Sequence, residues 1–360
     1  MKKDNYVAIM AGGIGSRFWP MSRTVFPKQF LDILNHGRTL IQSTYDRFAQ
    51  FIPKENIYIV TSQQYEAIVM KQLPHLNPEN ILCEPSRKNT APCVAYISFK
   101  LQQLNPKSNL ICAPADHLVS DTTAFTKVSI EALDFTAKHN ALLTLGIKPT
   151  YPNTGYGYIQ YEEQSVTDNV YKVKTFTEKP DVELAKTFIA SGDFLWNAGI
   201  FVWQTKNIIQ AFEKYLPEIH EVFDAEKKCF NTAREKNAIE KIYPLCVNIS
   251  IDYGILEKAD NVYVIPSSFG WSDLGAWSSA YENLAKDYQE NAVVGSNVII
   301  FDAVKNMVHA DNKKLILLQG LEDFIVVDTP DVLLICKKEK EQEIKEYLSE
   351  VKRNKGEKFL

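Results

Sequence analysis

The sequence lacks the patterns that hold most structural metals and disulfides. Its six cysteines form no CxxC pair and show no regular spacing, and its six histidines form no HExxH pattern. Most of the cysteines lie among apolar residues, which favours buried free thiols in a reducing compartment. The first apolar run, YVAIMA, is too short for a signal peptide, and no later run is long enough to cross a membrane. These absences favour a cytoplasmic enzyme or binding protein.

The sequence also lacks a basic block. Its 40 lysines and arginines are outnumbered by 44 acidic residues, which gives a net charge of −4. This balance argues against nucleic acid as a partner, so any bound anion must be held by a few placed cations and backbone amides. With 360 residues, 45% of them hydrophobic, the chain can build one large domain or two ordinary ones.

Apolar runs alternate with helix-like stretches up to about residue 150. The strand-like runs are 6–12, 57–62, 109–117 and 141–147, and the helix-like stretches are 39–52, 63–75, 90–104 and 123–138. This alternation predicts an α/β fold in which helices cover both faces of a parallel sheet. From about residue 151 the strands become shorter, which indicates a mixed second half.

The pattern of apolar runs changes again from about residue 291. Four β-rich runs separated by turns are followed by a charged amphipathic helix over 338–353. These runs are consistent with a few coils of a β-solenoid. We therefore predict two domains, 1–287 and 288–360.

Three glycines, Gly12, Gly13 and Gly15, stand where the first strand-like run ends, and this pattern indicates a phosphate site, because glycine lets backbone amides approach an anion. A P-loop is excluded, since no lysine stands at the required spacing. A dinucleotide fingerprint is weak: Gly13 and Gly15 fit, but Phe18 occupies the third glycine position.

What remains is a wider loop from Gly12 to Arg17, followed by Arg23 and Lys28. Spaced cations along a long loop suit a triphosphate, which carries several charges along its length. The alternative is a glycine turn followed by a solvated basic surface.

The loop sequence resembles the signature of the sugar-1-phosphate nucleotidyltransferases, in the form found in the mannose-1-phosphate guanylyltransferases. The resemblance continues, in the family's order, through nearly the whole chain. It rests on AGGIGSRFWPMSR and FPKQF (11–30), EPSRKNTAP (84–92), APADH (113–117), YGYI (156–159), FTEKP (176–180), WNAGIF (196–201), SIDYGILEK (250–258), GWSDLGAW (270–277) and VVDTPDVLLIC (326–336).

This resemblance implies a Rossmann-like, GT-A-like mixed sheet flanked by helices, followed by a small C-terminal domain like a short left-handed β-helix. It also implies that GTP and α-D-mannose 1-phosphate react with the help of Mg²⁺ to give GDP-mannose and diphosphate. In the family the solenoid often mediates dimer contacts, so a homodimer is expected. Some bacterial relatives carry a further cupin-type isomerase domain; we expect this chain, which ends at Leu360, to be monofunctional.

The resemblance also implies roles for individual residues. The catalytic cations would be Arg17, Lys28 and Lys179; the nucleotide would be bound by Ala11, Gly12, Gly13, Gly15, Ser16, Glu84, Pro85, Asn89, Thr90 and Ala91; the sugar by Gly157, Glu178 and Asn197; and the metal by Asp116 and Asp273. The role of Asp252 is left open: it can support the metal-binding residues without touching the metal, or it can be structural.

Each of these residues also has a simpler explanation. Asp116 and Asp273 can be turn or helix caps, although two carboxylates can also hold Mg²⁺ and leave positions for phosphate oxygens and water. Glu178 and Lys179 can be an exposed surface pair, and Asn197 a buried structural amide. Glu84, the candidate acceptor for guanine, can merely open a turn.

Three other functions compete with the guanylyltransferase reading. The chain could act on another sugar 1-phosphate or nucleoside triphosphate, as a glucose-1-phosphate uridylyltransferase does. It could be a sensor that binds GDP-mannose without catalysis, although such a protein should have lost the cations and carboxylates that this sequence retains. A nucleotide-binding dehydrogenase is disfavoured by Phe18.

Overall fold

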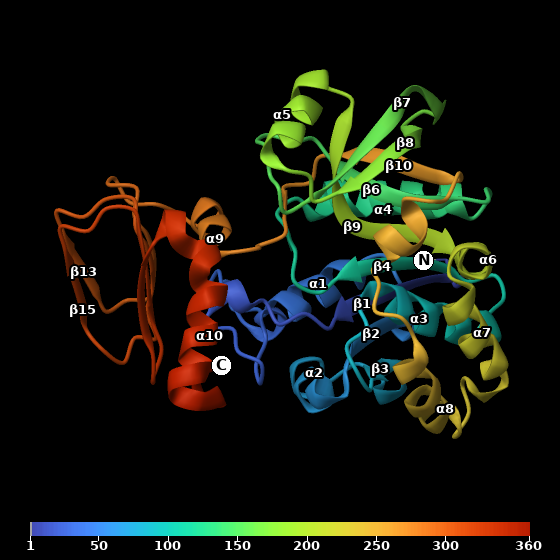
Figure 1. Ribbon diagram of the computed structural model, residues 1–360, viewed down its shortest axis with the longest axis horizontal. Helices are drawn as coiled ribbons and strands as arrows, with labels where there is room; N and C mark the ends of the chain where they lie inside the picture. Colours follow the sequence, from blue (N-terminus) through green and yellow to red (C-terminus); the bar gives the residue numbers. More distant parts are fainter. Residues whose placement is uncertain (1) are drawn as a thin grey trace. The chain divides into compact units, whose positions relative to one another are not determined.

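A computed structural model describes residues 2–360 (Figure 1). The chain forms two compact units, each built from separate segments: unit 1 comprises 2–12, 45–115 and 119–271, and unit 2 comprises 13–44, 116–118 and 272–360. Three elements lie where the chain passes between units: α1 (Leu40–Phe48), β5 (Leu118–Val119) and β11 (Trp271–Ser272). Because each unit combines segments from different parts of the chain, the units do not test a single domain boundary after residue 287, and that boundary stays a prediction.

Unit 1 is built on a nine-stranded sheet, counted over residues 2–360, with the order β3-β2-β1-β4-β9-β6-β10-β8-β7. Its strands are β1 (Asn5–Ala11), β2 (Ile57–Ser62), β3 (Ile81–Glu84), β4 (Asn109–Pro114), β6 (Leu142–Ile147), β7 (Gly157–Thr167), β8 (Val170–Glu178), β9 (Phe194–Gln204) and β10 (Val262–Ser267). The first four pair in parallel, whereas β9 runs antiparallel between β4 and β6. The predicted α/β fold with a mixed second half is confirmed.

Helices cover the sheet of unit 1. They are α2 (Glu66–Gln72), α3 (Thr90–Leu104), α4 (Thr122–Thr136), α5 (Val182–Ser191), α6 (Thr205–Tyr215), α7 (Pro217–Ala225) and α8 (Glu235–Ile242). Alternation along β1 separates two faces: Tyr6 and Ala8 join the core formed with α3, α6 and α7, while Val7 and Ile9 point to the opposite face. None of the helices described is long and apolar enough to cross a bilayer.

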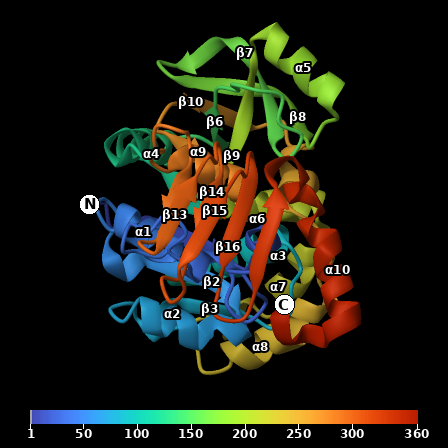
Figure 2. The ribbon, with the colours of Figure 1, turned by 90° about the vertical axis from the view of Figure 1, so that its left-hand side faces the viewer.

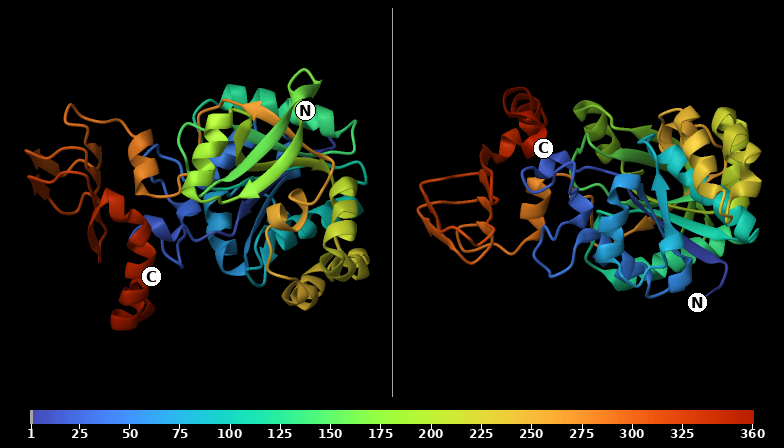
Figure 3. Two further views of the ribbon diagram at one scale, coloured as in Figure 1. Left: turned by 45° about the horizontal axis from the view of Figure 1, so that its top comes forward. Right: turned by 90° about the horizontal axis from the view of Figure 1, so that it is seen from below.

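The far edge of this sheet has its own small core. Helix α5, light green in Figure 3, packs on β7 and β9. The rings of Phe188 and Phe194 stack with their centroids 4.0 Å apart. This packing steadies β7–β9, the strands that carry the predicted sugar-binding residues.

The C-terminal part of unit 2 contains stacked strands that pair in parallel, except for the last pair, which is antiparallel (Figure 2). One sheet has the order β12 (Ala292–Val294), β14 (Met307–His309), β16 (Phe324–Asp328), β17 (Leu333–Lys337), and a second pairs β13 (Val298–Phe301) with β15 (Ile316–Gln319). Val308, Leu318 and Val326 pack between the two sheets. The coils confirm the β-helix-like C-terminal region expected from the sequence.

Buried asparagines tie successive coils together. Asn306 donates from its backbone N–H and its side-chain amide to Oδ1 of Asn291, at 2.9 and 3.0 Å, and its own Oδ1 accepts from Phe324 N–H at 2.9 Å. Helices α9 (Trp277–Asn283) and α10 (Ile344–Lys355) cover the other side of the four-stranded sheet, where Trp277, Met307 and Ile344 are fully buried.

Candidate active site

The glycine loop of unit 2 is packed tightly against its own lysine. Gly15 has φ of +68°, and a Cβ there would lie 2.5 Å from Cβ of Lys28, so only glycine fits. A short 3₁₀ turn follows, Ser16–Phe18, in which Phe18 is fully buried and its ring lies 5.0 Å from that of Trp277. Phe18 therefore fills the core at the position where a dinucleotide fingerprint has its third glycine. A Cβ on Gly13 would meet nothing within 4 Å, so the backbone is open at that point.

Lys28 organises both predicted metal ligands. Its side chain is 5% exposed, and its ammonium lies 2.8 Å from Oδ2 of Asp116 while donating to the carbonyl oxygens of Asp273 and Leu274, each at 2.9 Å. Three acceptors match the three N–H groups of an ammonium. In this arrangement Lys28 positions Asp116 and the 273–274 turn, and a contact to phosphate would replace one of these three acceptors.

The electrostatics keep Asp116 ionised. Burial alone would raise the pKa of Asp116, but the Lys28 ammonium and His117 outweigh this effect and hold the pKa below its usual range. The other carboxylate, Asp273, accepts at Oδ1 from the N–H of Gly275 at 3.0 Å. Unit 2 thus contains two oriented carboxylates linked through one buried ammonium.

Arg17 faces another cation. Its Nε is buried and has no hydrogen-bond partner among the described residues, and the nearby Arg17 charge lowers the pKa of Lys345, which burial lowers further. Lys345 lies on α10, and the C-terminal segment is also joined to the loop by a hydrogen bond of 2.7 Å from Trp19 Nε1 to the carbonyl oxygen of Phe359. Two neighbouring cations favour an anion between or beside them.

Arg23 does not act as a phosphate cation in this structure. Its guanidinium makes a bidentate pair with Asp331, at 2.8 and 2.6 Å, and its Nε donates to the Pro20 carbonyl at 3.0 Å. This pairing lowers the pKa of Asp331 to about 2. Of the three spaced cations in the sequence, Arg23 is thus paired with Asp331 in this structure.

In unit 1, Glu84 and Gly12 lie together. Glu84 ends β3 and is 8% exposed; a Cβ on Gly12 would lie 3.4 Å from its Oε2, while its Oε1 accepts a hydrogen bond from the Tyr243 hydroxyl. Burial raises the pKa of Glu84 to about 7, although the Tyr243 hydrogen bond opposes the shift. A carboxylate with one constrained and one available oxygen can accept from the N–H groups of a purine.

The rest of the predicted base-binding segment caps a helix. Asn89 accepts from the N–H of Thr90 at 2.9 Å, Thr90 Oγ1 accepts from the N–H of Ile251 at 2.9 Å, and Ala91 donates to the Ile249 carbonyl at 3.1 Å. These bonds begin α3 and join it to residues 249–251. In the same unit the carbonyl of Ala11, at the end of β1, accepts from Thr61 Oγ1 at 2.8 Å.

The three predicted sugar-binding residues are brought together. A Cβ on Gly157 would overlap Oε2 of Glu178 and lie 3.4 Å from Cβ of Asn197. Glu178 is paired with Lys179, whose φ of 50° shows that the chain has left the extended conformation. The adjacent charges therefore meet where β8 ends and the chain turns.

The Asn197 amide is fixed by its neighbours. Its Oδ1 accepts from Thr144 Oγ1 at 3.0 Å and from the Gly199 N–H at 3.1 Å, and its Nδ2 donates to Oδ1 of Asp252 at 3.0 Å. Burial raises the pKa of Asp252 to about 7, and the charge of Glu178 adds to the shift. Asp252 thus orients the side-chain amide of Asn197, the predicted sugar-binding residue.

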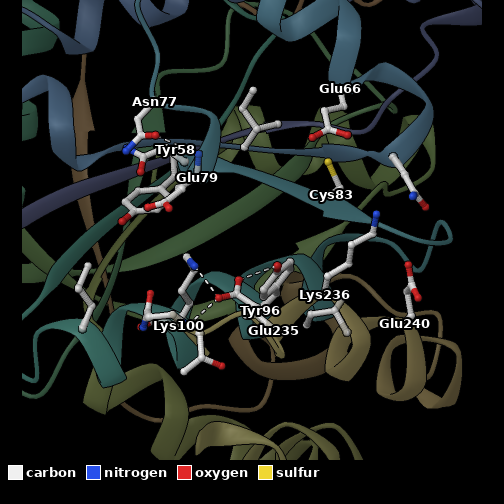
Figure 4. A pocket seen from close by; sticks show the side chains of 18 of the residues that line it. Tyr58, Glu66, Asn77, Glu79, Cys83, Tyr96, Lys100, Glu235, Lys236 and Glu240 are labelled. Atoms are coloured by element: carbon white, nitrogen blue, oxygen red, sulfur yellow. Dashed lines mark hydrogen bonds and ion pairs between the residues drawn. The ribbon is translucent and has the colours of Figure 1, made fainter. Parts of the chain in front are cut away.

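A cavity of about 860 Å³ in unit 1 is a separate feature (Figure 4). Of the predicted site residues it is lined by Pro85 alone. Its wall is ordered by Glu235, which accepts from Tyr96 at 2.8 Å and pairs with Lys100 at 2.6 Å. The cavity therefore does not coincide with the predicted sugar and metal residues.

Comparisons with known proteins give the family. A nucleotidyl transferase family model matches residues 6–290, and a model of the mannose-phosphate isomerase/GMP-like β-helix domain matches 296–351. The chain belongs to the nucleotidyl transferase family. It is 34% identical to mannose-1-phosphate guanylyltransferase of Escherichia coli, over 96% of this chain and 73% of that protein.

Two further matches support the assignment. Alginate biosynthesis protein AlgA of Pseudomonas syringae is 35% identical over 95% of this chain and 70% of that protein. A crystal structure described as mannose-1-phosphate geranyltransferase from Thermus thermophilus has 30% identity and a TM-score of 0.87, covering 97% of this chain and 99% of that one. This nucleotidyl transferase therefore shares its fold with a solved relative along nearly its whole length.

Nucleotidyl transferases generally use a divalent metal, and their substrates are a nucleoside triphosphate and a sugar phosphate. The residues of this nucleotidyl transferase fit such a metal, since Asp116 is held ionised and Asp273 is oriented by Gly275. No group of three metal-ligating side chains exists among residues 2–360. Two carboxylates leave coordination positions for phosphate oxygens and water, the arrangement that a small hard cation favours.

Several contributing residues of the nucleotidyl transferase gave little signal in the sequence. Tyr243 and Thr144 act through hydrogen bonds to Glu84 and Asn197, from positions 159 and 53 residues away. Lys345 stands in a charged helix in which another lysine, Lys352, forms a surface pair with Glu357. The one available signal was Asp252, an acidic residue inside the quoted SIDYGILEK segment.

Proposed function

We propose that this nucleotidyl transferase is a mannose-1-phosphate guanylyltransferase, which converts GTP and α-D-mannose 1-phosphate to GDP-mannose and diphosphate. The proposal is supported by the relatives of that name and by the retention of every predicted cation and carboxylate. The observation that carries it is the buried Lys28 ammonium, which contacts both Asp116 and Asp273. A sensor without catalysis would have no use for such an arrangement.

Unit 2 would serve the phosphates and the metal. Asp116 and Asp273 would hold Mg²⁺, which when bound supplies positive charge to the reacting phosphate oxygens. The amides of the loop including Gly13, Gly15 and Ser16 would approach the triphosphate, and Arg17 would offset the charge of the departing diphosphate. Lys345 joins Arg17 in this role.

Unit 1 would serve the base and the sugar. Glu84, when ionised, would accept from guanine N1–H and the exocyclic amine, two donors that adenine does not present in that place. Gly12, Pro85 and the capped segment containing Asn89–Ala91 would shape the nucleotide site. Glu178 and Asn197 would bind sugar hydroxyls, and Lys179 would bind the sugar phosphate.

The reaction needs neither a covalent intermediate nor a strong base. The phosphate oxygen of the sugar 1-phosphate is already ionised near neutral pH, so it can attack the α-phosphorus of GTP in line while diphosphate leaves. The obstacle is the repulsion of two polyanions, roughly 4 kcal/mol for each pair of unit charges 4 Å apart at an effective dielectric of ~20. The cations therefore act by positioning reactants and offsetting charge.

A cytoplasmic homodimer, with a catalytic domain at 1–287 and a β-rich domain at 288–360, belongs to the same proposal. On the outer face of the β13–β15 pair, Ile299, Phe301 and Leu317 are 43%, 52% and 57% exposed. An apolar strand face of this kind is suited to burial against a second copy. All six cysteines are free thiols, as a reducing compartment requires.

Product analysis tests the proposal. The chain should form GDP-mannose, identified by mass, from GTP and mannose 1-phosphate with Mg²⁺, and chelation of the metal should abolish the reaction. Asp116→Asn should reduce turnover by at least a hundredfold, with Asp302→Asn, an exposed carboxylate, as control. Tight binding of GDP-mannose without any turnover would contradict catalysis and indicate a sensor.

A further inference from the structure

The segment VVDTPDVLLIC, which contains Asp328 and Asp331, has no role in the proposed reaction. In unit 2 it lines a cavity of about 360 Å³, called here the Asp328 cavity. Its other polar walls are His309 at the end of β14, Asp311 in the turn that follows, and Arg23. In Figure 2, β14 and β16 lie close together, so His309 and Asp328 end neighbouring coils.

Three buried polar atoms at this cavity have no hydrogen-bond partner within residues 2–360. They are Nε2 of His309, Oδ2 of Asp311 and Oδ2 of Asp328. His309 is 9% exposed and Asp328 only 3%. Buried polar groups are nearly always satisfied in folded proteins, because leaving one unpaired costs about 1–3 kcal/mol. Three such atoms at one cavity therefore indicate a ligand that provides hydrogen bonds.

The charges around the cavity indicate the sign of that ligand. Arg23 is engaged by Asp331, and Lys314 donates to Oδ1 of the Asp328 carboxylate at 2.8 Å. Lys313 lies 3.8 Å from Oδ2 of Asp311, beyond hydrogen-bonding distance. With Asp32 near His309, four carboxylates face three cations, Arg23, Lys313 and Lys314, so the surroundings of the cavity keep an excess of negative charge.

His309 adds no positive charge to oppose a cation. Burial lowers its pKa to about 4, although the nearby Asp32 carboxylate opposes the shift. Its ring is neutral at physiological pH, and the Trp277 ring lies against it at 5.8 Å. A neutral imidazole nitrogen can accept a hydrogen bond from a ligand, as the two aspartate oxygens can.

The ligand does not reach these groups as a bare metal ion. No three ligating side chains of residues 2–360 are spaced to hold a metal directly. A cation that carries its own hydrogen-bond donors can bridge the wider spacing, either as an organic ammonium or as a hydrated divalent metal. We propose that the Asp328 cavity binds a small cation that donates hydrogen bonds to His309, Asp311 and Asp328.

Thermal denaturation with matched cations tests the site. Methylammonium donates three hydrogen bonds, whereas tetramethylammonium carries the same charge with no donor. At equal ionic strength, methylammonium should raise the denaturation midpoint of the full chain saturably, and tetramethylammonium should not. A second series uses Mg²⁺ in place of the ammonium ions. Because Mg²⁺ would also bind the predicted catalytic carboxylates, the readout is the difference between the midpoint shifts of wild type and Asp328→Asn.

Variants decide where the cation binds. Asp328→Asn and, separately, Asp311→Asn should weaken the apparent affinity at least tenfold; the second keeps the Lys314–Asp328 pair and guards against misfolding of the first. Asp302→Asn makes the same charge change at an exposed position and should leave the affinity unchanged.

A donor-specific response that the cavity variants lose supports the site, and the series that shows it tells an ammonium from a hydrated metal. Equal responses to both ammonium ions, full responses in the cavity variants, or no response to any cation would overturn the proposal and leave water as the only partner of the three atoms.

Discussion

The most quantitative prediction concerns the dependence of GTP binding on the protonation of Glu84. Its pKa of about 7 lies well above the usual range for glutamate because the carboxyl group is buried at the end of β3. Only the ionised form can accept from both guanine donors. With a pKa near 7, roughly one tenth of the molecules are ionised at pH 6 and nine tenths at pH 8. The dissociation constant for GTP should therefore fall about tenfold between these pH values.

Titration calorimetry of GTP binding between pH 6 and 8 measures this change. Glu84→Gln should remove it, and because GTP titrates identically with both proteins, its own ionisation cancels in their ratio. Tyr243→Phe removes the hydrogen bond that opposes the shift, so its affinity change should move to higher pH. Glu79→Gln, an exposed carboxylate, is the matched control. If the ratio of the GTP dissociation constants of wild type and Glu84→Gln stays constant between pH 6 and 8, Glu84 does not contact guanine.

Stability should respond to the same group with the opposite sign. Because the folded state raises the pKa of Glu84, folding favours the protonated form; this contribution is complete below the ordinary glutamate pKa and is lost as the pH rises through about 7. Each pH unit within that window changes the free energy of unfolding by about 1.4 kcal/mol. Glu84→Gln should therefore gain stability over wild type above pH 7, as measured by denaturant unfolding, and no gain would contradict the raised pKa.

Four further predictions follow from the sites. Lys28→Met should lower both turnover and the thermal midpoint, because it leaves Asp116 without its ammonium; an unchanged midpoint would contradict the positioning role. Gly157→Ala should raise the KM for the sugar phosphate at least tenfold with little change in the KM for GTP, because its Cβ would displace Glu178, and equal changes in both constants would argue against a sugar site there. Lys345→Ala should reduce kcat about tenfold without loss of stability, and a full kcat would remove it from the diphosphate site. Asp252→Asn should raise the sugar-phosphate KM and flatten its change near pH 7, where a purely structural role would alter only the thermal midpoint.

The alternation of strands and helices was predictable because burial on both faces leaves continuous apolar runs. The predicted helix at 90–104 coincides with α3, since Asn89 caps its start and the apolar residues continue to its end. Residues 338–353 were predicted as one helix, but a 3₁₀ segment occupies Lys338–Glu343 before α10 begins. The antiparallel insertion of β9 between β4 and β6 depends on pairings far apart in the chain, which local patterns do not encode.

The predicted site residues were found by resemblance, and the structure adds their partners. The sequence suggests Lys28 as a charge but does not reveal that Asp116 and two backbone carbonyls engage its ammonium. It presents Arg23 as another cation, although Asp331, 308 residues away, neutralises it. Pairings of this kind arise only when distant segments fold together, so a charge pattern alone does not tell a ligand-binding cation from a structural one.

The central claim is the guanylyltransferase activity, and diphosphate release tests it most directly. Four nucleoside triphosphates should be combined with mannose, glucose, fucose and N-acetylglucosamine 1-phosphates, with and without Mg²⁺. We predict that GTP with mannose 1-phosphate and metal gives the highest kcat/KM, by at least a hundredfold over other pairs. A different preferred pair would contradict the base and sugar assignments, and absence of diphosphate from every mixture would contradict catalysis.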